Sequence, residues 1–188
     1  GMLNVSFRAG SRIPTLALLY RLEGDRKWAD RAIAELRAVA AFTDWNHPGH
    51  FLDVAEMTTA VSFGYDWLYD ILSPEDRVKI IHALVEKGLQ PALPFYRGDV
   101  DTSVHVPWAQ ASFNWNLWCN GAMVLGALAV AEDEPALSGK VVWEAVRSMP
   151  IALDSFAPDG GYPEGPSYWA TATQYTLYAA HALRSALG

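Results

Sequence analysis

Hydrophobic and polar residues recur along most of the chain with the spacing of three to four residues that is typical of α-helices. In residues 27–42, for example, Trp28, Ile33 and Leu36 fall on one side of a helix and Arg31 on the other. No stretch of useful length alternates in the manner of a β-strand. The pattern therefore predicts an all-α protein with about seven helices, over approximately residues 12–22, 27–42, 52–72, 74–89, 114–131, 136–156 and 168–187.

Two of these helices carry further signals. Residues 52–72 are apolar over much of the helix circumference, which predicts a buried helix. The next helix is expected to start with Ser73 as its N-cap and Pro74 at its first position. We expect it to fray at Pro91 and Pro94, because proline cannot donate a backbone hydrogen bond.

The connections between the expected helices are mostly short, so consecutive helices should pack as antiparallel hairpins. A polar loop rich in Gly and Pro twice precedes an aromatic-rich helix, in residues 42–69 and 158–178. This echo predicts a single helical domain over residues 1–188, arranged as an incomplete (α/α) toroid. Residues 97–113 lack periodicity, and a loop of this length is usually functional or mobile.

Composition narrows the classes of function. The formal net charge of −7 argues against nucleic-acid binding, which needs a basic surface. No segment is apolar for long enough to span a membrane, and no signal peptide is visible. Cys119, the only cysteine, lies in an apolar helical stretch and is expected to be a buried thiol. Eight Trp and eight Tyr suit either core packing or a carbohydrate groove, where flat rings stack on sugars.

The candidate chemistry is concentrated where the helix of residues 114–131 begins. Asn114, Asn116 and Asn120 occur there within eight residues, although Asn is unfavourable inside helices. Asn116 and Asn120 are four residues apart and share a helix face. This pattern indicates that a polar surface is presented to a ligand. Two of the residues also fit structural roles, Asn114 as an N-cap and Asn120 as a buried hydrogen-bonding residue.

The segment Asn114-Trp115-Asn116-x-x-Cys119-Asn120-Gly121 resembles the heparinase II/III-like polysaccharide lyases. Residues 157–169, Ala-Pro-Asp-Gly-Gly-Tyr-Pro-Glu-Gly-Pro-Ser-Tyr-Trp, and residues 50–57 are similar to the same family. The resemblance implies an α/α toroid that cleaves uronic-acid polysaccharides, such as heparan sulfate or alginate, by β-elimination. Members also carry a β-sandwich region after the toroid. That region has no counterpart in the 188 residues, so the resemblance predicts an incomplete lyase site.

β-Elimination needs donors that stabilise the enolate on the uronate carboxylate, and a base and an acid at C5 and O4. By resemblance, either Asn116, which we prefer, or Asn114 holds the carboxylate, and Tyr168 is the catalytic acid or base. Ser167 is expected to cap the last helix and so to place Tyr168 in its first turn. The further substrate-binding candidates are Asn114, Asn120, His105, Trp115, Glu164 and Trp169. His105 equally fits a solvated loop position.

Other functions are open at this stage. Glu164 with Asp159 or Asp53 could form the carboxylate pair of an α/α-barrel glycoside hydrolase. The chain could instead be a noncatalytic carbohydrate-binding or remnant domain. His47 and His50 lie near two acidic residues, but their spacing is not a recognised zinc pattern, so neither a metal nor a cofactor is expected.

The expected partner is an acidic polysaccharide or oligosaccharide. An open helical array exposes apolar edges, so a homodimer is a further expectation. The family resemblance favours a periplasmic or secreted location.

Overall fold

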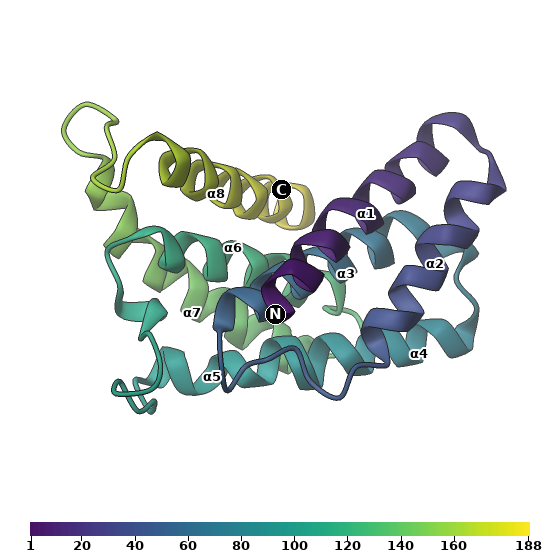
Figure 1. Ribbon diagram of the computed structural model, residues 1–188, viewed down its shortest axis with the longest axis horizontal. Coiled ribbons are helices and arrows are strands. Elements are labelled where there is room, and N and C mark those ends of the chain that lie inside the picture. The colour runs from purple at the N-terminus through teal and green to yellow at the C-terminus, as the bar shows by residue number, and fades with distance from the viewer.

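The computed structural model describes residues 1–188, which form helices and connecting segments without strands (Figure 1). The α-helices are α1 Met2–Glu23, α2 Arg26–Ala40, α3 Phe51–Leu68, α4 Pro74–Ala83, α5 Gln90–Arg97, α6 Asn114–Ala129, α7 Pro135–Leu153 and α8 Pro166–Leu187. A π-helical segment, Leu84–Leu89, joins α4 and α5 into one rod, so the chain contains seven rods. The all-α class and the number of helices are confirmed.

The helices form two layers. In the inner layer α1 packs against α3, α3 against α6, and α6 against α8, while α2 and α7 pack outside as the hairpin partners of α1 and α6. The helices α3, α6 and α8 all run from left to right in Figure 1, so they begin on the same side of the protein. We call this side the loop end. Such an order of hairpins suits the predicted toroid, which stays a prediction.

Small residues allow the inner helices to pack closely. A Cβ atom at Gly121 of α6 would lie 2.5 Å from the backbone oxygen of Tyr175 in α8. A Cβ atom at Gly64 of α3 would lie 2.5 Å from Cγ2 of Ile13 in α1. Glycine at these positions therefore sets the distance between neighbouring helices.

We expect Gly121→Ala to lower the free energy of unfolding by about 1–3 kcal/mol, because the added methyl group must push backbone away from backbone. The matched control is Gly139→Ala in α7, where a Cβ atom would meet nothing within 4 Å. The control should raise stability by about 0.5–1 kcal/mol through helix propensity. Urea unfolding of both variants checks this, and a stabilised Gly121→Ala protein would contradict the proposed close contact.

The first helix is longer than the sequence pattern predicts, since it begins at Met2 rather than near Arg12. Its added turns bury Ser6 and Ala9, and these residues continue the stripe formed by Ile13 and Ala17. Small side chains contribute little to a hydrophobic pattern, so the spacing of the stripe was not visible in the sequence.

The rod that begins at Pro74 continues to Arg97, which corrects the expected fraying near Leu89. The π-helical turns come immediately before Pro91, where the chain lacks an N–H donor and the proline ring would clash in a regular α-helix. The wider turn accommodates the proline, and the helix resumes after it.

The predicted cap at the start of this rod is confirmed. The Ser73 hydroxyl accepts a hydrogen bond of 3.1 Å from the Asp76 amide, and Pro74 is the first helical residue. Arg37 of α2 donates two hydrogen bonds, of 2.7 and 2.8 Å, to the buried carboxylate of Asp76. These bonds from Arg37, with a third from Ser73, lower the pKa of Asp76 to about 2.

We expect Asp76→Asn to destabilise the protein at pH 7 more than at pH 2. The folded-state pKa of Asp76 lies below its ordinary value of 3.8, so the ionised carboxylate contributes stability above pH 3.8. That contribution is lost as the pH falls from about 4 to about 2. Urea unfolding of both proteins across this range is the measurement. A difference in stability that does not change with pH would contradict the role of the ion pair.

The loop of residues 98–113, which was expected to be either functional or mobile, is anchored to the core by an aromatic side chain. A short 3-10 helix, Trp108–Gln110, places the fully buried Trp108 ring against Phe95, at 5.4 Å between ring centroids, and against Phe51, at 5.0 Å. No helix in the structure is both long enough and apolar enough to cross a membrane.

Candidate functional site

Two of the motif segments meet at the loop end. The carboxylate of Glu164 accepts hydrogen bonds of 2.7 Å from both the backbone N–H and the side-chain amide of Asn114. These residues are 50 positions apart in the sequence. Glu164 therefore binds the first residue of α6 and places a negative charge at the positive end of that helix. The alternative role of Asn114 as an N-cap is wrong, because the cap is Phe113 and Asn114 is the first helical residue.

Tyr168 and Trp169 lie at the start of α8, and both are exposed, at 47% and 43%. The N-cap of α8 is Gly165 rather than the expected Ser167, which is the second helical residue. Tyr168 is nevertheless in the first turn, as predicted. The Trp169 indole donates a hydrogen bond of 2.9 Å to the backbone oxygen of Gly160, which fixes the ring on the preceding loop.

Asn116 lies inside the protein, with 0% of its surface exposed. Its amide nitrogen donates to the Ser148 hydroxyl of α7 at 3.0 Å, and its oxygen accepts a 3.1 Å bond from Asn120. Asn120 is also fully buried, and it accepts a hydrogen bond of 2.9 Å from the Tyr96 hydroxyl. In this structure both side chains are used to join α5, α6 and α7, and neither faces a ligand. The buried alternative for Asn120 matches its position.

His50 and Trp115 connect the loop before α3 to α6. Their rings meet edge to face with centroids 4.9 Å apart. The buried carboxylate of Asp53 accepts a 2.5 Å hydrogen bond from Asn46, and it lies 3.5 Å from Nδ1 of His50. Asp53 therefore braces this loop and is directed away from solvent.

The remaining candidate, His105, is partly buried and lies edge-on to Phe95, with ring centroids 5.9 Å apart. Its neighbour Asp101 is exposed. No group of three or more His, Cys, Asp or Glu side chains is arranged to hold a metal ion.

Two buried polar atoms near the Glu164–Asn114 contact lack hydrogen-bond partners in the protein. They are Oδ1 of Asn114 and the hydroxyl of Tyr162. Burial and the nearby charge of Glu164 raise the pKa of Tyr162 well above its ordinary value, so this hydroxyl stays protonated. The loop end thus contains a protonated phenol and an unpaired amide oxygen.

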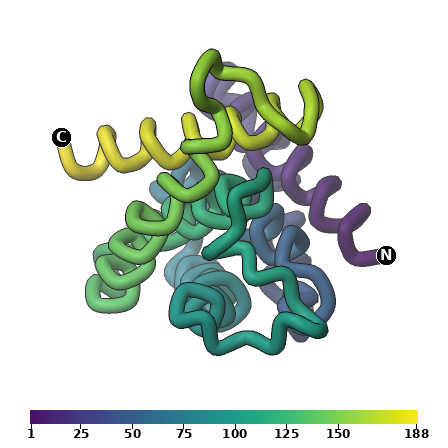
Figure 2. Tube along the Cα trace, turned by 90° about the vertical axis from the view of Figure 1, so that its left-hand side faces the viewer, coloured from purple at the N-terminus to yellow at the C-terminus, as the bar shows by residue number.

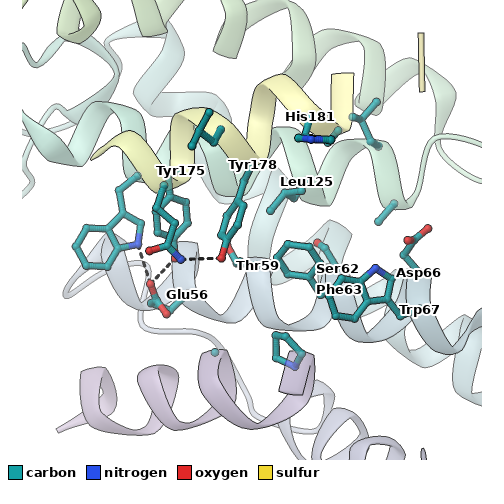
Figure 3. Close-up of a pocket in the computed structure, with 18 of the residues that line it drawn as sticks. Glu56, Thr59, Ser62, Phe63, Asp66, Trp67, Leu125, Tyr175, Tyr178 and His181 are labelled. Carbon is teal, nitrogen blue, oxygen red and sulfur yellow. Dashed lines mark hydrogen bonds between the residues drawn. The ribbon is translucent and has the colours of Figure 1, made fainter. Parts of the chain in front are cut away.

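Glu56, one of the two acidic residues near His50, lines a groove between α1 and α8, as does Asp66 of the same helix (Figure 3). Its Oε1 accepts hydrogen bonds from the Trp118 indole, at 2.8 Å, and from the Tyr175 hydroxyl. Burial raises the pKa of Glu56, and burial together with the Glu56 charge raises the pKa of Tyr175. The sequence signal for this buried carboxylate is an acidic residue within a helix that is apolar over most of its circumference.

The expectation for Cys119 is confirmed, since it is a free and fully buried thiol. Burial raises its pKa well above the ordinary value, so the thiolate that acts as a nucleophile is disfavoured.

No family model matches the chain, and no curated protein matches it significantly. The resemblance to the lyases therefore rests on the quoted motifs.

Proposed function

We propose that this chain takes part in the β-elimination of a uronic-acid polysaccharide at its loop end. The observation that carries the proposal is the contact between Glu164 and Asn114, which brings together the two motifs that most resemble the lyase family. Those motifs were selected on sequence alone, and they are far apart in the chain. Tyr168 follows Glu164 by four residues and lies in the first turn of α8.

Tyr168 is the proposed acid or base. Its ring is exposed, so its hydroxyl can reach the C5 proton or the O4 leaving oxygen of a bound sugar. Trp169 offers a second exposed ring on which a sugar face can stack. Both side chains are on the first turn of a helix 22 residues long, which gives them a rigid support.

The carboxylate of the uronate needs donors other than Asn116, because that side chain is buried and bonded. The first turn of α8 leaves the backbone N–H groups of Ser167 and Tyr168 without helical partners. Such groups, together with the helix dipole, favour an anion. In this proposal they bind the carboxylate, and Asn116 supports the site from within.

The test is incubation of the protein with heparan sulfate, alginate and other uronic polysaccharides. Elimination leaves a conjugated C4–C5 double bond, which absorbs ultraviolet light, whereas hydrolysis leaves none. Reducing ends that appear with the absorbance would support the lyase proposal. Reducing ends without the absorbance would favour the paired-carboxylate hydrolase, and the absence of any product would contradict catalysis by this chain.

A noncatalytic carbohydrate-binding role is the second candidate. This role is favoured because neither carboxamide predicted to hold the substrate is free to do so. Asn116 is buried, and Asn114 is bonded to Glu164. Exposed aromatic rings would then account for binding without chemistry. Calorimetric titration with oligouronates separates the two roles. Binding without product supports the second candidate, and the absence of binding counts against both.

A further inference from the structure

The groove that contains Glu56 is distinct from the loop end. It has a volume of about 1010 Å³ and is lined by α1, α3, α6 and α8. Figure 3 shows its side chains, with Glu56 at one end and Asp66 and Trp67 at the other. None of the residues assigned to the loop end lines it. The chemistry of this groove therefore does not depend on the lyase activity.

Glu56 has one oxygen that the protein leaves free. Only 8% of the residue is exposed, and both of its hydrogen bonds, from Trp118 and Tyr175, go to Oε1. Oε2 receives no hydrogen bond from the protein. It lies beside Gly10 of α1, where a Cβ atom would come within 2.6 Å of it. Glycine at this position keeps the approach to Oε2 open. A ligand that donates to this free oxygen would form a charge-assisted hydrogen bond with the carboxylate.

Aromatic rings form a continuous row along the groove from this carboxylate. The centroids of Trp118 and Tyr175 are 5.5 Å apart, those of Tyr175 and Tyr178 are 5.6 Å apart, and those of Tyr178 and Phe63 are 5.3 Å apart. Trp67 extends the row, at 5.0 Å from Phe63. The faces of such rings carry negative electrostatic potential and attract cations.

The charged residues that line the groove also favour the binding of a cation. Its lining contains two carboxylates, those of Glu56 and Asp66, and neither Lys nor Arg. His181 is the only lining residue that can become positively charged. An anion such as a uronate would be repelled by these carboxylates, with no Lys or Arg to offset the repulsion. A cation would be attracted by both the carboxylates and the rings.

We propose that this groove binds a small organic ammonium ion, with the ammonium group on Oε2 of Glu56 and an apolar body against the aromatic row. A primary ammonium group fits best, because it can donate a hydrogen bond to the free oxygen as well as interact with the rings. The wall contributed by Phe63 and Leu125 suits an apolar or aromatic body.

The test compares three compounds of similar shape by calorimetric titration: 2-phenylethylammonium, the neutral 2-phenylethanol and the anionic 3-phenylpropionate. We expect the ammonium compound to bind about tenfold or more tightly than the alcohol, which corresponds to about 1.4 kcal/mol, and the anion to bind most weakly. Because this comparison uses the unaltered protein, it does not depend on the folding of any variant. Equal binding of the amine and the alcohol, or no amine binding at about 10 mM, would overturn the proposal.

Glu56→Gln keeps an oxygen for the bonds from Trp118 and Tyr175 but replaces Oε2 with an amide. We expect it to abolish the preference for the amine over the alcohol. The matched control is Glu134→Gln, which removes one exposed negative charge outside the groove and should leave the preference unchanged. Loss of the preference in both variants would show that net charge, rather than the groove, is responsible, and it would overturn the assignment.

Discussion

Replacing Tyr168 with Phe is expected to lower the rate at which unsaturated product forms by about 100-fold or more, while oligouronate binding changes little. The variant removes only the hydroxyl, and loss of a general acid or base commonly costs about 10²–10⁴ in rate. The side chain is exposed on the first turn of α8, so the loss of its hydroxyl should not disturb the core. The measurement is the initial rate of ultraviolet absorbance on a polysaccharide that the unaltered protein cleaves.

The matched control is Tyr69→Phe. Tyr69 is exposed to a similar degree, at 40%, but it follows the far end of α3 from the loop end. It should retain full activity. If Tyr168→Phe cleaves at the rate of this control, Tyr168 is not the acid or base, and the elimination chemistry needs another residue.

Asn116→Ala is expected to lower the free energy of unfolding by about 3 kcal/mol. The substitution deprives the amide of Asn120 and the hydroxyl of Ser148 of a shared partner within a buried network. Asn120 and Ser148 keep a hydrogen bond of 2.8 Å to each other, but each hydrogen bond that the network loses contributes about 0.5–1.5 kcal/mol. Because the network also includes the backbone oxygen of Ala109, the loss should loosen the segment before α6.

Urea unfolding measures the effect, with Asn4→Ala on the exposed surface of α1 as the control. The control should change stability by less than about 0.5 kcal/mol. This outcome also distinguishes the two roles of Asn116. If the variant loses turnover without losing stability, Asn116 binds the substrate, as the sequence resemblance implies. That result would contradict its role in the buried network.

The helices could be predicted because their signals are local. The amphipathic pattern of α2 and the cap at Ser73 each depend on residues within a few positions of one another. The same locality explains one error. The stripe of Ser6 and Ala9 in α1 has little hydrophobic contrast, and it becomes a helix face only by packing on α3.

The site was less predictable, because the sequence cannot say which way a polar side chain points. Asn114, Asn116 and Asn120 look alike as a pattern. Their roles diverge because Glu164 reaches the first and Ser148 the second. The place of Glu56 in the groove could not be predicted for the same reason, since its partners Trp118 and Tyr175 are 62 and 119 residues away.

The π-helical turns before α5 have a consequence for register. Each residue of an α-helix advances the chain by about 100°, so a widened turn of this kind changes the direction in which all later side chains point. In this rod the change directs Phe95 towards Trp108 and Tyr96 towards Asn120. The π-helical turn therefore sets the direction of the later side chains of the rod. Through these side chains it sets the contacts that hold the loop before α6.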